Sequence, residues 1–548
     1  MITPNWLTSH LPKAERLVDS MTIGDVLAHE WVEALLLEQS GGPGRRRELT
    51  TRTLFVAFQL MVMDGEFYLK DVPALLDSLS PRSRVRLGLP RTGPTVTERQ
   101  VGYLFGIIND ALRRNFTEDN LRNDERFADF DQLFSAIAIA GAHAASNSSL
   151  SISVDGSDIA TWGKSHKVHQ RVMETGPNGE LVPVMVDGHV EYQRVKVSSD
   201  PDATWRGSRD VDGKKSHFGY TLTAAVSTRD ENGSDVPRAV VAARFRPMNF
   251  HDREMGLACI GEVAMRRGQL GDVLVDRGYT NSMDGKDFLS LVRAMGGEPV
   301  FDLTVHQVGS RPPVLGAVII DGRPYSPSLP QRLYKISPPH GKDDGSYKPS
   351  PEALRKYQEQ IAEREQWALV PHGSRRPNGV QVFMCPAVAG KLTCPLQQPT
   401  RGIRRGALPV LNAPTNPQPG TVCTNRYSSF TMDELPLYQR YVYGSAQWKA
   451  SYNRRGTSVE PYFGALKDAA GSGLSRGRIR VTGIVKTGLL VAFAAAATNE
   501  RLARAFDARP PVTATRAHRT GRPRVNNLGV YRQKVIDAAD SKTVVLTT

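Results

Sequence analysis

Three short stretches, far apart in the chain, each carry a carboxylate that could take part in metal-assisted chemistry. They are Ser153-Val154-Asp155-Gly156, Val275-Asp276-Arg277-Gly278-Tyr279 and Val459-Glu460-Pro461-Tyr462-Phe463-Gly464. Two or three acidic side chains gathered at one point can bind a pair of Mg²⁺ ions, which activate an attacking oxygen and neutralise a leaving oxygen in phosphoryl transfer. Such chemistry requires a fold that brings Asp155, Asp276 and Glu460 together.

The segment before Asp155 has the alternating pattern of a β-strand. Leu150, Ile152 and Val154 alternate with serines at positions 149, 151 and 153. This pattern predicts a strand with one buried face and places Asp155 at its end. Asp158 would then lie past the strand end, where only a reversal of the chain brings it near a metal.

Strand and helix patterns alternate through the next 150 residues. Strands are predicted over 218–226 and 239–245, joined across a turn at 231–233. The segments that follow are predicted as helix 251–267, strand 272–275, helix 283–295 and strand 299–303. This order indicates an α/β layer architecture, whose ligand sites lie beyond strand ends. Asp276 is at such a place, whereas Asp252 is better explained as the start of its helix.

The order of these elements and their acidic residues resembles the RNase H-like catalytic core of DDE transposases from bacterial insertion sequences. The resemblance covers about 145–505 and implies a mixed sheet flanked by helices. In the relevant subgroup the third acid belongs to a signature of Tyr, two residues, Arg, three residues, Glu, six residues and Lys. Tyr452, Arg455, Glu460 and Lys467 match it here, with one extra residue before the Glu.

The resemblance also implies an activity. Asp155, Asp276 and Glu460 would be catalytic and would bind Mg²⁺, with Mn²⁺ as a substitute, while Tyr452, Arg455 and Lys467 would contact DNA. The enzyme would cut at the ends of its own mobile element and join the freed 3'-hydroxyl to target DNA in a two-metal reaction. Its implied partners are double-stranded DNA, namely terminal inverted repeats and target, and a second copy in a homodimer on that DNA. The implied location is the bacterial cytoplasm, at the nucleoid.

Two other functions stay open from the sequence. One is an inactive, transposase-derived repressor that binds the inverted repeats. The presence of all three carboxylates argues against it. The other is a metal-dependent nuclease that does not join strands, which would use the same chemistry.

The segment around Glu460 is consistent with a functional helix in its own right. Glu460, Gly464 and Lys467 are spaced for one face of a helix, while Val459, Phe463 and Leu466 form a neighbouring apolar stripe. A metal-binding acid and a phosphate-binding cation would then point to the same cleft. An exposed helix with an ordinary acid–base pair is the alternative.

The charge of the chain favours a polyanionic partner. Lys and Arg exceed Asp and Glu to give a formal net charge of +14, and each neutralised phosphate releases condensed counterions. Arg476, Arg478 and Arg480 alternate along one segment and, with the Lys214-Lys215 pair, are candidates for DNA contact; solvated basic loops are the alternative. No membrane partner is expected, because the longest apolar run, 489–497, is far shorter than the about 20 residues of a spanning helix.

The chain divides into five predicted segments. They are a helical N-terminal domain over 1–145, the first part of the catalytic core over 146–305, an inserted β-rich subdomain over 306–444, the second part of the core over 445–506, and a flexible basic tail over 507–548. The N-terminal domain is interpreted as DNA-binding, with a structural helical bundle that carries a solvated basic turn as the alternative. Within the insertion, β-hairpins are predicted around a helix over 351–366. Asp200 and Asp202 are predicted to belong to a polar loop.

Four cysteines agree with a reducing, intracellular compartment. Cys385, Cys394 and Cys423 lie in the insertion and lack the close pair that a structural zinc site usually has, although His372 could supply a fourth ligand. Zinc binding and free thiols therefore both stay open. Trp448, shortly before Tyr452, is interpreted as a core side chain or as a platform for an extruded base.

Overall fold

The computed structural model describes residues 49–113, 127–142, 144–177, 179–210, 213–280, 286–339, 349–376, 378–399, 408–468, 472–475 and 477–509. For residues 165–167, 194–196, 208–210, 213–216 and 286–287 the description covers the backbone only. The described residues from 49 to 506 belong to one compact unit. The predicted tail over 507–548 lies outside the described residues except for its first three.

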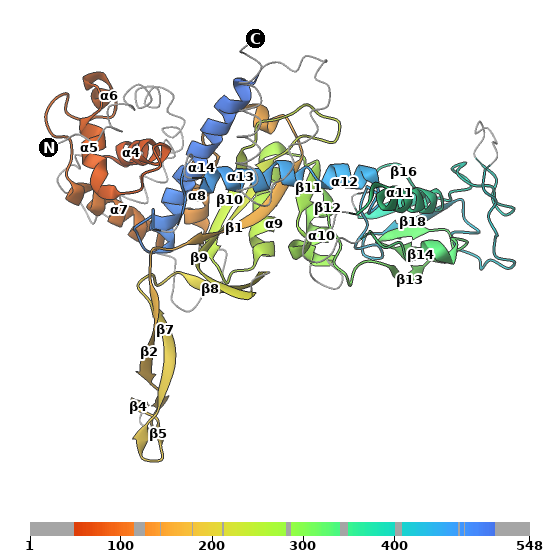
Figure 1. Ribbon diagram of the computed structural model, residues 1–548, viewed down its shortest axis with the longest axis horizontal. Coiled ribbons are helices and arrows are strands. Elements are labelled where there is room, and N and C mark those ends of the chain that lie inside the picture. Colours follow the sequence, from red (N-terminus) through yellow and green to blue (C-terminus); the bar gives the residue numbers. More distant parts are fainter. Residues whose placement is uncertain are drawn as a thin grey trace, which may run out of the picture. The chain divides into compact units, whose positions relative to one another are not determined.

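A mixed sheet of six strands forms the centre of this unit (Figure 1). Neighbouring strands follow the order β10-β9-β1-β11-β12, and β8 pairs with the first half of β9. The pairs β10-β9 and β9-β1 are antiparallel, while β1-β11 and β11-β12 are parallel. The strand bounds are β1 Ile152–Ala160, β8 Thr204–Asp210, β9 Gly213–Ser227, β10 Val240–Pro247, β11 Asp272–Val275 and β12 Glu298–Phe301.

The predicted order of strands and helices over the first part of the core is confirmed. β9 and β10 are joined through a turn in which the Gly233 amide donates to the carbonyl oxygen of Asp230. Helix α9 (Asp252–Arg267), β11, helix α10 (Lys286–Ala294) and β12 then follow in the predicted sequence. The chain is therefore α/β with a mixed sheet and helices, as expected.

Two predictions about β1 are wrong. The strand continues to Ala160, so Asp155 is inside it and Asp158 does not lie past its end. The reason is that the parallel ladder with β11 stops at Val154, whereas the antiparallel ladder with β9 continues to Ala160. The serine side is also buried rather than exposed, as Ser153 is fully covered, because the sheet is packed on both faces.

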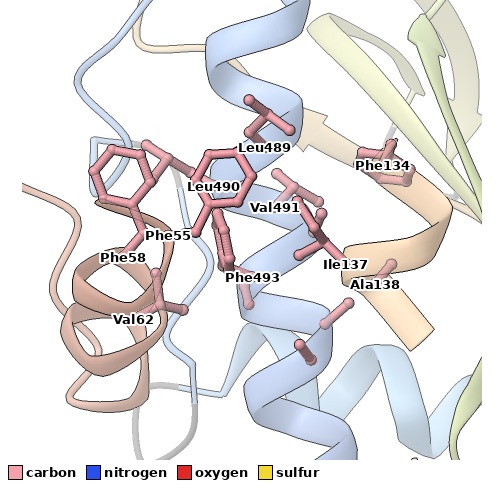
Figure 2. Packing of buried hydrophobic residues seen from close by; sticks show 14 of the residues in the cluster. Phe55, Phe58, Val62, Phe134, Ile137, Ala138, Leu489, Leu490, Val491 and Phe493 are labelled. Carbon is pink, nitrogen blue, oxygen red and sulfur yellow. The ribbon is translucent and has the colours of Figure 1, made fainter. Parts of the chain in front are cut away.

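One face of the sheet packs against helices from both ends of the unit. Phe55 and Phe58 of α4 (Thr51–Met63) contact Phe493 of α14 (Ile484–Asp507), with ring centroids 5.4 and 5.8 Å apart (Figure 2). Phe134 of α8 (Ala128–Ile139) stacks on Phe245 of β10. The helices α5 (Val72–Asp77), α6 (Pro81–Arg86) and α7 (Glu98–Arg113) belong to the same helical region. The helices over 51–139 therefore share one apolar core with the sheet.

The opposite face of the sheet packs against α9 and α10. Ile152, Val154, Val273 and Val275 contribute to this second core, together with side chains of the two helices. The central strands are thus nearly continuous runs of buried residues, as expected for strands covered on both sides.

The segment 306–444 contains two small sheets and one long helix. Antiparallel strands β13 (Ser310–Val314), β14 (Ala317–Ile320) and β15 (Arg323–Tyr325) form one sheet, and β16 (Val370–His372), β17 (Val380–Met384) and β18 (Tyr427–Thr431) form the other. Helix α11 spans Pro351–Gln366, as predicted, and its buried Arg364 donates to Asp321 at 2.7 Å. The predicted hairpins around a helix are confirmed.

A narrow ribbon between β1 and β8 was not predicted. Its stem consists of β2 (Ser165–Arg171) and β7 (Tyr192–Ser198), and its far part contains the short pairs β3 (Met173–Thr175) with β4 (Leu181–Pro183) and β5 (Met185–Val186) with β6 (His189–Val190). None of the helices in the described ranges combines the length and the apolar character that crossing a bilayer requires.

Candidate active site

The three predicted acids converge on one guanidinium group. Nη2 of Arg455 lies 2.5 Å from Oδ2 of Asp155 and 4.0 Å from Oδ2 of Asp276, and Nη1 donates to Oε1 of Glu460 at 2.9 Å. The side chain of Arg455 is 12% exposed, whereas Asp276 and Glu460 are nearly half exposed. The fold therefore brings Asp155, Asp276, Glu460 and Arg455 to one place that is open to solvent on its acidic side.

The register of the central strands explains why the two aspartates meet. Val154 of β1 is paired with Val275 of β11, and this is the last pair of the parallel ladder. Asp155 is the next residue of β1 and Asp276 directly follows β11, so both lie where the parallel ladder ends. Asp276 is then held by the next backbone amide, that of Arg277, at 2.6 Å.

Glu460 reaches the same place from helix α13 (Val459–Lys467). The buried side of this helix carries Val459, Tyr462, Phe463 and Leu466, and the helix packs against β1 and β9. The hydroxyl of Tyr462 also donates to the carbonyl oxygen of Ala495 in α14, at 3.0 Å. Because this side is anchored, Glu460 at the second helical position is directed to the other side.

Arg454 holds the segment in front of α13. Its buried guanidinium is paired with Asp272 at the start of β11 and donates to the carbonyl oxygens of Arg229 and Ser451. The adjacent Arg455 opens a short 3₁₀ turn (Arg455–Thr457) that leads into the helix. Sequence reasoning missed Arg454, because its sequence shows only two adjacent arginines and not which of them is buried.

Burial and charge act against each other in this cluster. Burial raises the pKa of the Asp155 carboxyl above its ordinary value, while Arg455 and the backbone amide of Gly156 oppose that rise. Three ionised carboxylates would exceed the single positive charge of Arg455. The cluster would then carry a net negative charge, which a bound divalent cation would neutralise.

Tyr452 lies at the end of α12 (Ala446–Tyr452) and stacks on Trp448, with ring centroids 5.2 Å apart and an interplanar angle of 6°. Burial raises the pKa of the Tyr452 hydroxyl to about 12. The indole of Trp448 also donates to Gln439 and packs beside Tyr443. Because protein groups already cover Trp448, the structure favours its role as a core side chain.

Lys467 and Asp158 are linked through the backbone. The Nζ of Lys467 donates to the carbonyl oxygen of Asp158 at 2.9 Å, and burial lowers the pKa of this lysine. The Asp158 carboxylate lies three residues from Asp155 on the same strand and so faces the other side of the sheet. There it pairs with Arg206, which also pairs with Asp252.

The candidate phosphate-binding arginines have partners within the protein. Arg478 donates to the carbonyl oxygen of Gly65 at 3.0 Å, and Arg480 lies over the rings of Tyr68 and Trp162. Arg476 lies outside the described residues. Lys214 and Lys215 belong to β9, and their side chains are not described.

Asp200 and Asp202 lie in the turn between β7 and β8, as the predicted loop requires, but the turn is not a solvated one. Both are buried, and they accept hydrogen bonds from the backbone amides of Gly483 and Ile484 at 3.0 and 2.8 Å. The hydroxyl of Tyr220 also donates to Asp200. The first amides of a helix have no partners within it, and these two carboxylates supply partners for the start of α14.

Three cysteines meet in the insertion. Cys385, Cys394 and Cys423 line one pocket, and the backbone amide of Leu396 donates to the Sγ of Cys394. Burial raises the pKa of the Cys385 thiol and raises that of Cys423 to about 11. His372 instead packs against Tyr427, with ring centroids 4.8 Å apart.

The described ranges contain no preformed metal-binding site. They contain no group of three or more His, Cys, Asp and Glu residues that could hold a metal ion as arranged. At the acidic cluster, the guanidinium of Arg455 lies between the carboxylates, which explains this finding for Asp155, Asp276 and Glu460.

Comparison of the chain with protein-family models, with curated proteins and with solved structures found no match.

Proposed function

We propose that this protein is a DDE transposase with an RNase H-like catalytic core, which cuts DNA at the ends of a mobile element and joins them to target DNA. The convergence of Asp155, Asp276 and Glu460 on Arg455 carries this proposal. These acids come from three distant stretches, and two of them are nearly half exposed, so their carboxylate oxygens are accessible to a metal ion and a substrate.

The topology of the sheet supports the same function. Three antiparallel strands are followed by two parallel ones in the order β10-β9-β1-β11-β12, with helices on both faces. A mixed sheet flanked by helices is what the resemblance to the RNase H-like core implies. Two of the acids follow the last paired residues of its two central parallel strands.

The donor atoms at this site fit Mg²⁺. Asp155, Asp276 and Glu460 offer carboxylate oxygens, the ligands that Mg²⁺ prefers, and Mn²⁺ accepts the same set. When bound, such ions supply activation of a water or 3'-hydroxyl and stabilisation of the leaving 3'-oxygen. The three carboxylates would hold the ions at the end of the parallel ladder.

The surrounding residues have roles of their own. Arg455 balances the charge of the carboxylates and presents a planar fork suited to a phosphate. Lys467 lies two turns along the same helix as Glu460 and carries a compact charge that could bind a second phosphate. Trp448 stacks on Tyr452 and so fixes the position of its ring. Arg454 pairs with Asp272 and so anchors the backbone next to Arg455.

The test separates binding of DNA from its cleavage. Asp155→Asn, Asp276→Asn and Glu460→Gln should each abolish Mg²⁺-dependent cleavage and joining of DNA that carries the inverted repeats flanking the gene. Affinity for that DNA should be unchanged or slightly higher, because it comes from Lys and Arg and a repelling charge is gone. Asp158→Asn is the matched control, since this carboxylate lies on the same strand but faces Arg206.

The possible outcomes distinguish the alternatives. Full cleavage by any one of the three acid variants would remove that residue from the site. Cleavage without joining by the unaltered protein would indicate a nuclease, and specific binding without either reaction would indicate a repressor.

A further inference from the structure

The stem of the ribbon between β1 and β8 has an unusual cross-strand pairing. In the antiparallel register of β2 and β7, Lys167 is opposite Lys196, His169 is opposite Arg194, and Arg171 is opposite Tyr192. Like charges directly opposite each other destabilise a strand pair. A ribbon that keeps this pairing gains stability when an anion lies along it.

These positions share one face of the ribbon. Residues two apart on a strand lie on the same side, so 167, 169 and 171 of β2 form one row with 192, 194 and 196 of β7. The other side pairs Val168 with Val195 and Gln170 with Gln193.

The stem segments 165–171 and 192–198 contain no Asp or Glu. We call the row of Lys167, Arg171, Arg194 and Lys196 the basic face.

The far part of the ribbon has the opposite charge. Residues 173–191 contain no Lys or Arg, and their acids are Glu174, Glu180, Asp187 and Glu191. Met173 and Leu181 in this part are 44% and 69% exposed. A polyanion would therefore be attracted to the stem and repelled from the tip, which confines its contact to a defined length of ribbon.

The stem is tied to the core at its base. The backbone amide of Lys164 donates to Ser199, and that of Ser199 donates to the carbonyl oxygen of Lys164, at 3.1 and 3.2 Å. The hydroxyl of Thr161 donates to the buried Asp200, which also holds the start of α14. These hydrogen bonds fix the base of the ribbon to β1, the strand that carries Asp155.

We propose that the basic face binds the phosphate backbone of double-stranded DNA. The proposal rests on the proposed function, because it gives the DNA of a transposase a second point of attachment. Seven extended residues span about 23 Å, which is about two thirds of a helical turn of the duplex. A two-stranded ribbon is also narrow enough to follow the major groove.

The test measures DNA binding without metal, so that it does not depend on catalysis. In the full-length chain, Lys167, Arg171, Arg194 and Lys196 are changed together to Gln, and binding to a random-sequence duplex is measured in EDTA over a range of salt concentrations. Affinity at low salt should fall at least about tenfold, and the slope of log K against log salt should become shallower by up to about one unit per lost phosphate contact.

The matched control removes the opposite charges from the same ribbon. Changing Glu174, Glu180 and Glu191 to Gln and Asp187 to Asn should leave affinity unchanged or higher. The thermal midpoint of the stem variant should equal or exceed that of the unaltered protein, because the like charges of Lys167 and Lys196 no longer face each other. A lower midpoint would overturn the premise that this pair destabilises the free protein.

The outcomes separate the two proposals. If the unaltered chain binds DNA and the stem variant binds with the same slope, only the ribbon proposal fails. If the unaltered chain does not bind duplex DNA at all, the transposase proposal fails with it. If the stem variant loses binding to vesicles that contain phosphatidylserine but keeps binding to DNA, the basic face is a membrane contact and the proposal is overturned.

Discussion

Arg455 and Asp155 are 300 residues apart in the chain, yet Nη2 of the arginine lies 2.5 Å from Oδ2 of the aspartate. The same guanidinium also bonds Glu460. It thus joins the central sheet to the start of α13 and offsets part of the repulsion among the acids. A divalent cation would satisfy the same carboxylates more fully, so the arginine and the metal are expected to compete for them.

Arg455→Ala should make the stability of the folded protein depend on Mg²⁺. Loss of the guanidinium leaves three carboxylates without a counter-charge, which should lower the free energy of unfolding by about 1–3 kcal/mol after allowance for solvent screening. Added Mg²⁺ should restore more stability to this variant than to the unaltered protein. Urea unfolding with and without Mg²⁺ measures both effects.

The control for that change is Arg440→Ala, which removes an arginine that pairs with Glu231 and is itself 58% exposed. It should change the free energy of unfolding by less than about 1 kcal/mol and show no response to Mg²⁺. Equal responses of the two variants to Mg²⁺ would show that Arg455 and the metal do not share the carboxylates.

The buried pair of Arg454 and Asp272 should be essential for stability. Their side chains are 2% and 5% exposed, and a charge left alone at such a place costs about 3–5 kcal/mol. Arg454→Met and Asp272→Asn should each destabilise the protein by this amount, as measured by urea unfolding. The double variant should lose less than the sum of the two, because neither charge is then left without its partner; additive losses would mean that the two residues act separately.

Lys467→Ala should reduce both catalysis and binding of the element's ends. Its Nζ is held by the carbonyl oxygen of Asp158, so its removal takes away a positioned charge without removing a carboxylate. We expect a partial loss of cleavage rate, together with a lower affinity in a gel-shift assay. Asp158→Asn keeps that carbonyl group and should retain more activity; an Asp158→Asn variant as impaired as Lys467→Ala would contradict this assignment.

The thiols of the insertion should be slow to react and should hold no stoichiometric zinc. The pKa of Cys423 is raised from 9.0 to about 11 by burial, so its thiol is neutral at pH 8 and its alkylation should accelerate about tenfold per pH unit towards pH 10. The raised pKa stabilises the folded state below about pH 9, and this contribution should be lost as the pH rises through 11. Metal analysis that finds about one zinc per chain, with loss of thermal stability on chelation, would contradict the expectation.

Local sequence patterns were sufficient for most elements of the core and for the long helix of the insertion. The strand over 272–275 and the helix over 351–366 have the bounds that periodicity and breakers predict. Short-range rules succeed here because alternation, helical spacing and capping residues act over a few neighbours. The types and positions of Asp155, Asp276, Glu460 and Arg455 were also visible in the sequence, although not their distances.

The tertiary structure alone decided which residues meet. The ladder with β9 carries β1 on to Ala160, the register of β2 and β7 places Lys167 opposite Lys196, and Asp200 is buried beneath α14. Of two adjacent arginines, Arg454 became buried against Asp272 and Arg455 became the centre of the acidic cluster. Each outcome depends on partners up to 300 residues away, and the burial or pairing of a charge follows from those partners rather than from its neighbours in the chain.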